Sequence, residues 1–507
     1  MNTNLFSLLR QNFPSDLARP FLTRSDGSRI SYGEMLDGSA RLANLLGARG
    51  VRPGDRVAAQ VGKSPEALLL YLACLRAGAV YLPLNPAYTS GEVAYFLGDA
   101  EPALFICDGE RRAALAPVAE GSGVAHLETL NADGSGSLTE AAAGQPATFE
   151  DVPRARDELA AILYTSGTPR RSKGAMLADG NLLSNAEALR EAWRFTDQDV
   201  LLHALPIFHT HGLFVATNLM MLTGGSMIFL PGFDAGEVLR LLPQATTMMG
   251  VPTFYSRLLA QDGLTREHVS HMRLFISGSA PLSAETHRAF QARTGHAILE
   301  RYGMTETNMN TSNPYDGERR PGTVGAALPG VEVRIADPET GRVLTDGVGV
   351  IEIRGENVFK GYWRMPEKTA AEFRADGFFI SGDLGHFDED GYLHIVGRAK
   401  DLIISGGLNV YPAEVEAAIE ALPGIAECAA IGIPHADFGE GVVAVVVARP
   451  GASLAEGDVI GQLADTLARF KQPKRVFIVD ELPRNAMGKI RKDALRQSFA
   501  DCFGPPR

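Results

Sequence analysis

A cluster of hydroxyl, glycine and lysine residues lies between Tyr164 and Gly174, in the sequence Tyr-Thr-Ser-Gly-Thr-Pro-Arg-Arg-Ser-Lys-Gly. It follows an apolar run at residues 160–163 that predicts a β-strand. Backbone N–H groups and hydroxyls at such a junction can donate to phosphate oxygens, and Lys173 would add positive charge. The glycine spacing differs from that of the G-x-x-x-x-G-K-[ST] phosphate loop. Taken alone, the segment fits either a phosphate-binding loop or an exposed polar loop.

Polar motifs follow other apolar runs further along the chain. Ser277-Gly-Ser-Ala-Pro281 comes after residues 274–276, and Arg301-Tyr-Gly-Met-Thr-Glu-Thr307 comes after residues 297–299. Three more motifs complete the set: Ser381-Gly-Asp383, Gly397-Arg-Ala-Lys-Asp401 and Pro483-Arg-Asn-Ala-Met-Gly-Lys489. In order and spacing the motifs resemble the adenylate-forming superfamily, which contains acyl-CoA synthetases, peptide-synthetase adenylation domains and beetle luciferases. The resemblance covers nearly the whole chain.

This resemblance implies a site for ATP, Mg²⁺ and CoA. Tyr302 is expected to stack on adenine, and Asp383 is expected to accept hydrogen bonds from the ribose hydroxyls. Glu306 is expected to hold Mg²⁺, because one carboxylate suffices for a hydrated ion that also takes phosphate ligands. Lys489 is expected to reach the α-phosphate. The remaining nucleotide contacts are expected from Thr165, Ser166, Gly167, Thr168, Lys173, Ser279, Thr305 and Arg398.

The implied set suits the activation of a carboxylate. A carboxylate that attacks the α-phosphate brings one anion to another, so the site must place Mg²⁺, lysine and N–H groups where charge develops. Taken singly, Lys489 fits a solvated surface lysine and Asp383 fits a turn residue; only the whole set indicates a site. The catalytic group is expected to consist of Lys173, His209, Thr305, Glu306 and Lys489.

The family uses two orientations of its C-terminal lid for two half-reactions, with a hinge expected beside Lys400. In the second orientation Ser405, Gly406 and Gly407 are expected to line a tunnel for the pantetheine thiol, because adjacent glycines allow a close backbone approach. Lys471 belongs to a basic cluster that fits either the nucleotide phosphates of CoA or a solvated face. Acetylation of Lys489 would remove its charge and silence the first half-reaction.

Arg301 and His209 indicate the class of acid. A guanidinium beside the acyl pocket is costly unless an anion meets it, and arginine pairs with carboxylates in a bidentate manner. Residues 301–314 and the segment His209-Thr-His-Gly-Leu213 resemble malonyl-CoA synthetases, which implies a dicarboxylic acid. The alternatives are an ion pair of Arg301 with Glu300 and a His209 that only packs. The acyl pocket, including the site of the second carboxylate, is expected to consist of Ser277, Ser279, Met304, His209 and Arg301.

The predicted function is an ATP-dependent ligase that converts malonate, or methylmalonate, and CoA to malonyl-CoA, AMP and pyrophosphate through an enzyme-bound acyl-adenylate. No thiolation domain is expected after Lys489, which favours CoA as the acceptor; an enzyme that loads a separate carrier protein is the alternative. Pro169-Arg170 stand where the family usually has Thr-Gly. Proline removes a donor and arginine replaces a permissive glycine, so a nucleotide- or acyl-binding protein with reduced catalysis is a further alternative.

Composition restricts the class of protein. At 507 residues the chain exceeds one ordinary core, so two or more domains are expected. The net charge of −12 argues against a binder of nucleic acids or membrane surfaces. The most apolar stretch, 200–233, is interrupted by proline, histidines and glycines, and the N-terminus lacks a signal-peptide pattern. The four scattered cysteines suit a reduced, cytoplasmic protein.

An α/β scaffold must position these motifs. The first third alternates strand-like and helix-like runs, which predicts parallel sheets covered by helices; Ser64, Pro65 and Gly78 delimit one such helix. Residues 120–155 are predicted to be a surface excursion and residues 459–470 to be helical. The resemblance implies a large N-terminal domain of β-sheets flanked by helices, with a small β-barrel-like part, at residues 1–396. A hinge at 397–401 and a small mobile α+β lid at 402–507 are expected to follow.

Overall fold

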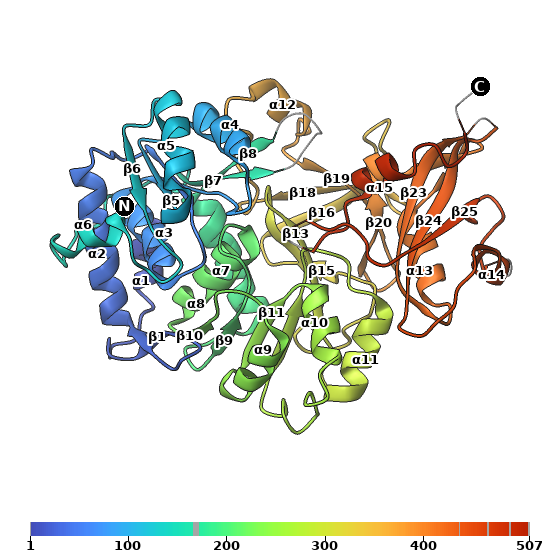
Figure 1. Cartoon of the computed structure of the whole chain (residues 1–507), viewed down its shortest axis with the longest axis horizontal. Helices are drawn as coiled ribbons and strands as arrows, with labels where there is room; N and C mark the ends of the chain where they lie inside the picture. Colours follow the sequence, from blue (N-terminus) through green and yellow to red (C-terminus); the bar gives the residue numbers. More distant parts are fainter. Residues whose placement is uncertain (1, 166–171, 436, 464–465, 486–487, 505–507) are drawn as a thin grey trace.

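The computed structural model describes residues 2–504 except 166–171, 436, 464–465 and 486–487. A nine-stranded sheet forms the lower part of the large N-terminal region (Figure 1), in the order β15-β14-β13-β12-β11-β9-β10-β1-β2. Strands β1, β10, β9, β11, β12 and β13 are mutually parallel along this order. The bounds are β1 (Pro20–Thr23), β2 (Arg29–Ser31), β9 (Val200–His203), β10 (Ser226–Phe229), β11 (Thr247–Gly250), β12 (Leu274–Ser277), β13 (Leu299–Met304), β14 (Asn308–Ser312) and β15 (Ala326–Ala327).

A six-stranded sheet forms the second layer of this region, in the order β6-β5-β3-β4-β7-β8. Its strands are parallel except for β8, which forms a hairpin with β7 and brings Thr165 opposite Lys173. The predicted phosphate loop is therefore the connection of a β-hairpin. The bounds are β3 (Arg56–Gln60), β4 (Val80–Pro83), β5 (Leu104–Cys107), β6 (His126–Thr129), β7 (Leu159–Thr165) and β8 (Lys173–Ala178).

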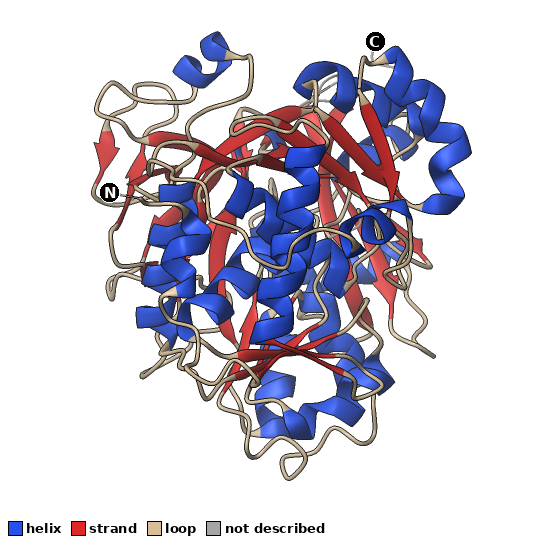
Figure 2. Ribbon diagram, turned by 90° about the vertical axis from the view of Figure 1, so that its left-hand side faces the viewer, coloured by secondary structure: helices blue, strands red, loops and turns tan. Residues whose placement is uncertain are grey.

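Helices cover both sheets, as Figure 2 shows. Helix α3 (Pro65–Ala77) is buried along almost its whole length, because its residues are apolar on every side. It has the predicted Ser64 N-cap, Pro65 in the first turn and Gly78 in the left-handed conformation. The other helices of this region are α1 (Leu5–Arg10), α2 (Tyr32–Ala48), α4 (Ser90–Ala100), α5 (Arg112–Gly121), α6 (Ser137–Ala143), α7 (Asp179–Trp193), α8 (Thr217–Thr223), α9 (Ala235–Leu241), α10 (Pro252–Leu259) and α11 (Ala284–Thr294).

A five-stranded antiparallel sheet, in the order β17-β16-β18-β19-β20, connects this region to the C-terminal part. Its bounds are β16 (Val331–Ala336), β17 (Val343–Leu344), β18 (Gly349–Gly355), β19 (Phe379–Phe387) and β20 (Leu393–Arg398), and helix α12 (Pro366–Ala371) precedes β19. Asp383 on β19 lies opposite Arg398 on β20. This sheet therefore brings two of the predicted nucleotide ligands together.

The C-terminal part has a sheet and hydrophobic clusters of its own, built from Ile403 onward. Its elements are β21 (Ile403–Ser405), β22 (Leu408–Val410), α13 (Pro412–Glu420), β23 (Ile425–His435), β24 (Gly439–Ala448), α14 (Glu456–Gln462), β25 (Arg475–Val479) and α15 (Lys492–Ser498). Figure 1 shows these elements on the right of the molecule. Arg449 forms an ion pair with Glu285 of α11, so the C-terminal part contacts the large region in this arrangement.

The predicted fold class, an α/β N-terminal region with a small α+β C-terminal part, is confirmed. Two local predictions were wrong. The segment 120–155 contains β6 and α6, whose apolar side chains Leu138 and Ala142 are buried; four- and seven-residue elements are too short to show a period. The helix predicted over 459–470 ends at Gln462, although Leu467 is buried in the C-terminal core. Among the described helices, none has the length and apolar character that a membrane crossing requires.

Candidate active site

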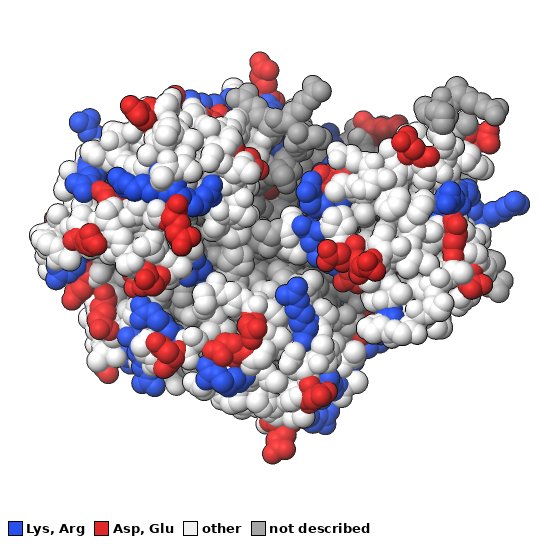
Figure 3. Space-filling view, in the orientation of Figure 1, with Lys and Arg blue, Asp and Glu red and all other residues white. Residues whose placement is uncertain are grey.

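The predicted acid-binding residues lie towards the carboxyl ends of the parallel strands in the nine-stranded sheet. His209 follows β9, Ser277 is the last residue of β12, and Arg301 lies within β13. Open α/β sheets bind ligands at this edge, because the loops leaving neighbouring strands converge there. Figure 3 shows the surface hollowed between the large region and the C-terminal part, with acidic and basic side chains interspersed around it.

Arg301 is a buried cation without a counter-ion. Its side chain is 3% exposed, and its Nε and Nη2 atoms have no hydrogen-bond partner among the described residues. The predicted alternative partner, Glu300, alternates to the other side of the strand and accepts a hydrogen bond from the Leu282 N–H at 3.1 Å. Burial lowers the pKa of Arg301 to about 9 and raises the pKa of Glu300 to about 8. The pocket therefore offers an anion two buried guanidinium donors.

Gly278 makes room for this guanidinium. A Cβ atom built on Gly278 would lie 2.4 Å from Cζ of Arg301, much closer than two carbon atoms can approach. The glycine of the Ser277-Gly-Ser279 motif therefore leaves the space that the Arg301 guanidinium occupies. Ser277 is fully buried and its Oγ also has no partner in the described part of the chain, so a second polar group is left for a ligand.

Two histidines line the same region. The Nδ1 atom of His211 lies 3.3 Å from Oγ of Ser279, while its buried Nε2 lacks a described partner. Ser279 has a φ of +72°, a conformation that residues with a side chain adopt only where the surroundings enforce it. Burial and the charges of Lys489 and Arg301 lower the pKa of His209 to about 3. His209 is therefore neutral near pH 7, and it lies close enough to both cations to feel their charge.

His211 is a pocket residue that the sequence prediction left out. It begins a buried π-helical turn, His211–Ala216, in which Gly212 accepts hydrogen bonds from His203 and Thr217. The available signal was the His209-Thr-His-Gly-Leu213 segment, from which only His209 was predicted as a site residue. Within the described ranges, no group of three or more His, Cys, Asp and Glu side chains is arranged to hold a metal ion.

The predicted nucleotide ligands Tyr302, Asp383 and Arg398 form one connected group. The Tyr302 hydroxyl donates to Oδ2 of Asp383 at 2.6 Å, and Nε of Arg398 lies 3.1 Å from Oδ1 of the same carboxylate. Burial, followed by the charge of Asp383, raises the pKa of Tyr302. Met304, at the end of β13, packs at the edge of the core beside Tyr302. Asp383 is thus held in one orientation by two residues.

Glu306 lies in the turn between β13 and β14, next to Thr305. Its Oε1 accepts a hydrogen bond from Oγ1 of Thr165 at 3.3 Å and lies 3.1 Å from the Tyr362 hydroxyl. Burial raises the pKa of Glu306. A single buried carboxylate fits a hydrated Mg²⁺ that takes its other ligands from water and phosphate. Ser166, Gly167 and Thr168 lie outside the described residues, as do Pro169 and Arg170.

Lys489 reaches this site from the C-terminal part. Gly488 lies beside the side chain of Thr253 on α10, and the backbone N–H of Lys489 donates to Oδ1 of Asn485 at 3.0 Å. Burial and the charge of Arg398 lower the pKa of Lys489 to about 8, although Asp383 and Glu306 oppose the shift. The structure therefore brings Lys489 among the predicted nucleotide, metal and acid ligands.

The residues predicted for the CoA half-reaction lie elsewhere in this arrangement. Ser405 is buried at the start of the β21–β22 hairpin, and Gly406 and Gly407 have φ values of +61° and +78°. Lys471 pairs with Glu414 at 2.5 Å. Lys400 is exposed in the short turn between β20 and β21. Among the described residues, no hydrogen bond or ion pair joins any of them to Arg301 or Lys489.

Family models match both parts of the chain. The AMP-binding enzyme family matches residues 10–363, and the AMP-binding enzyme C-terminal domain matches residues 414–489. A feruloyl-CoA synthase of Amycolatopsis sp is 36% identical, covering 94% of this chain and 95% of its own length. A malonate–CoA ligase of Arabidopsis thaliana is 32% identical, covering 94% and 86% respectively.

Solved structures match the whole chain. ATP-bound MatB from Rhodopseudomonas palustris is 59% identical over 99% of this chain and 100% of that chain, with a TM-score of 0.97. The apo form of that protein covers the same shares with a TM-score of 0.86. The arrangement described above is therefore more similar to the ATP-bound form.

Proposed function

Because the chain belongs to the AMP-binding enzyme family, we propose that it is an AMP-forming acid–CoA ligase that joins malonate to CoA through an enzyme-bound acyl-adenylate. The observation that carries the choice of acid is Arg301. A buried guanidinium without a described partner is costly, and a substrate with a second carboxylate removes that cost on binding. Malonate has one carboxylate for the reaction and one for Arg301.

The non-reacting carboxylate is bound by Arg301 together with neutral donors. Ser277 supplies a hydroxyl, and His211 supplies a ring N–H once its tautomer is set by Ser279. Burial and the neighbouring cations lower the pKa of His209 to about 3. His209 therefore stays uncharged beside them. A neutral imidazole can donate to one carboxylate without fixing a second charge in the pocket.

In the first step a carboxylate oxygen of malonate attacks the α-phosphorus of ATP, and pyrophosphate leaves with the electrons of the broken P–O bond. Glu306 would hold Mg²⁺, which when bound would neutralise charge on the phosphates. Lys489 stabilises the charge on the α-phosphate, while Lys173 and Thr305 contact the departing phosphates. Tyr302, Asp383 and Arg398 hold the adenosine end.

In the second step the CoA thiolate attacks the acyl carbonyl carbon, and AMP leaves. Lys489 is not needed for this second step. Between the two steps the lid turns at a hinge beside Lys400. Ser405, Gly406 and Gly407 then line the path of the pantetheine, and Lys471 exchanges Glu414 for a CoA phosphate. The similarity to an ATP-bound structure supports the assignment of the present arrangement to the first step. Acetylation of Lys489 would silence that step alone.

The free thiols support the proposed compartment. All four cysteines are free, three of them buried, and burial raises the pKa values of Cys74, Cys107 and Cys428. Such thiols persist where the surroundings are reducing, so the cytoplasm is the proposed location.

The test compares acids under one set of conditions. The protein is incubated with ATP, Mg²⁺ and CoA and with malonate, methylmalonate, butyrate or ferulate; pyrophosphate and the acyl thioester are both measured. Malonate is expected to give the highest kcat/KM, with methylmalonate roughly 10- to 200-fold lower at most, because a methyl group is worth only about 1–3 kcal/mol in a pocket. A preference for butyrate or ferulate would overturn the choice of acid. Pyrophosphate without thioester would indicate a carrier protein as the acceptor instead of CoA.

A further inference from the structure

A second carboxylate, Glu372, lies beside the phosphate lysine. Its Oε1 is 3.1 Å from Nζ of Lys173, and the two side chains are 19% and 12% exposed. Glu372 immediately follows helix α12, 199 residues away from Lys173 in sequence. The pair is largely shielded from water, so it holds Lys173 far more firmly than a surface ion pair would.

Tyr362 links this ion pair to the carboxylate that binds Mg²⁺. Its hydroxyl lies 2.6 Å from Oε2 of Glu372 and 3.1 Å from Oε1 of Glu306, and Nζ of Lys173 lies 4.0 Å from the centre of its ring. A phenol carries one proton. Tyr362 donates it mainly to Glu372, in the shorter contact, and only weakly to Glu306, in the longer one. Glu372 therefore sets the direction of the hydroxyl, and the hydroxyl in turn limits where Glu306 can lie.

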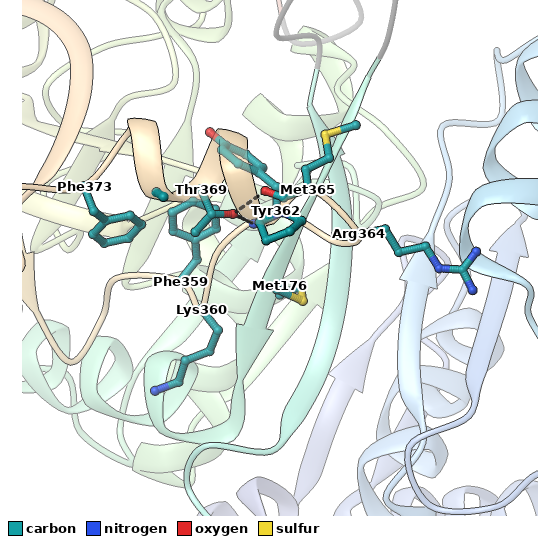
Figure 4. Close-up of a pocket in the computed structure, with 10 residues that line it drawn as sticks. Met176, Phe359, Lys360, Tyr362, Arg364, Met365, Thr369 and Phe373 are labelled. Atoms are coloured by element: carbon teal, nitrogen blue, oxygen red, sulfur yellow. Dashed lines mark hydrogen bonds between the residues drawn. The ribbon is translucent and has the colours of Figure 1, made fainter.

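Helix α12, which Glu372 immediately follows, is fastened to Tyr362 by a second route. Oγ1 of Thr369 accepts a hydrogen bond from the Tyr362 N–H at 2.9 Å and donates to the Met365 carbonyl at 2.9 Å. Figure 4 shows Tyr362, Thr369 and Met365 together at a pocket of about 630 Å³. Backbone and side chain of Tyr362 are thus both tied to α12, which leaves little freedom for Glu372 to move without them.

The charges around Glu372 agree with this geometry. Burial alone would raise its pKa, but hydrogen bonds from Lys368 and Tyr362 and the charge of Lys173 outweigh burial and lower the pKa below its usual value. Nζ of Lys368 lies 2.6 Å from Oε1 of Glu372, the oxygen that also contacts Lys173. Lys368 approaches from the solvent side, and its side chain is 46% exposed. Glu372 is therefore an anion with a buried cation on one side and an exposed cation on the other.

We propose that Glu372, acting through Lys173 and Tyr362, is the positioning residue of the phosphate half of the site, and that it holds Lys173 and Glu306 ready for the triphosphate and Mg²⁺. This inference rests on the proposed function, since it takes Lys173 and Glu306 as ligands of ATP and its metal. It predicts that both carboxylate oxygens at position 372 are needed in their present place. Glutamine keeps the reach of the side chain but has one acceptor oxygen where glutamate has two. Aspartate keeps both oxygens and the charge and is one methylene shorter.

The experiment measures ATP binding in the presence of Mg²⁺ by calorimetry, together with the Mg²⁺ concentration at half-maximal pyrophosphate release. Glu372→Ala and Glu372→Asp are expected to weaken ATP binding roughly tenfold, the size of one lost hydrogen bond to a charged group, and to raise the Mg²⁺ requirement. Glu372→Gln keeps one of the two acceptor oxygens and is expected to lose less than Glu372→Ala. The KM for malonate and the rate of thioester formation from preformed acyl-adenylate are expected to stay unchanged in all three variants.

The controls separate positioning from other effects. Lys368→Ala removes only the solvent-side contact of Glu372 and is expected to behave as wild type. Tyr362→Phe is expected to raise the Mg²⁺ requirement. Its effect should not add to that of Glu372→Ala, because both changes break the same connection between Glu372 and Glu306. Wild-type ATP affinity in a folded Glu372→Asp protein would overturn the proposal, as would an equal rise in the malonate KM. Calorimetry needs no turnover, so it tests Glu372 even if malonate proves to be the wrong acid.

Discussion

Replacing Arg301 by alanine is the sharpest test of how this pocket recognises its acid. The guanidinium is 3% exposed, and two of its nitrogen atoms have no described protein partner. A carboxylate bound there would receive two charge-assisted hydrogen bonds, each worth about 1.5–3 kcal/mol. Part of that energy is lost in removing water from the carboxylate, so a net loss of about 3 kcal/mol, or roughly 150-fold in kcat/KM, is expected for malonate.

The assay compares malonate with butyrate, which lacks the second carboxylate. In Arg301→Ala the kcat/KM for butyrate should change little or rise, so the ratio of the two acids collapses. The variant Arg301→Met adds a readout without substrate: a buried cation with no counter-ion destabilises the free protein, and an apolar side chain of similar length should raise its Tm. A malonate-to-butyrate ratio that survives in Arg301→Ala would refute the reasoning, whatever the loss of activity.

Further predictions concern pH, stability and the phosphate loop. Burial lowers the pKa of Lys489 to about 8, so kcat/KM for ATP in adenylate formation should fall as pH rises through about 8, where the lysine loses its proton; Lys489→Arg should remove that fall from the pH profile. The buried pair of Arg76 and Asp151, with N···O at 2.7 Å, should make Arg76→Ala about 3–5 kcal/mol less stable in thermal unfolding, because it leaves Asp151 unpaired. Replacing Pro169-Arg170 by Thr-Gly should increase the rate of pyrophosphate release if the altered loop limits catalysis, and an unchanged rate would show that it does not.

Individual residues show which features could be predicted from the sequence. The family, the fold class and the ATP-dependent ligation of malonate were predicted from motifs, and the punctuation of α3 by Ser64 and Gly78 followed from local rules. Arg301 was chosen by residue type. Three of its features depend on which side of β13 each side chain faces, which is a property of the folded sheet. They are its burial, the lack of described hydrogen-bond partners for Nε and Nη2, and the failure of Glu300 to pair with it.

Other features depend on contacts that no local pattern encodes. Tyr362 and Glu372 meet Glu306 and Lys173 across 56 and 199 residues, and they carry no motif that indicates a site. His211 lies two residues from His209, and only the π-helical turn shows that it points to Ser279. The hinge at Lys400 and the second position of the lid remain predictions, because a single arrangement of the C-terminal part contains only the contacts of one step.

Gly278 also bears on how this specificity could be lost over evolutionary time. A methyl group at that position would collide with the guanidinium carbon of Arg301, so alanine would force the cation out of its place without changing the cation itself. A glycine codon becomes an alanine codon by one base change. Descendants of this protein could therefore drift from diacids toward neutral acids through a neighbour of Arg301, while Arg301 stays intact in every sequence comparison.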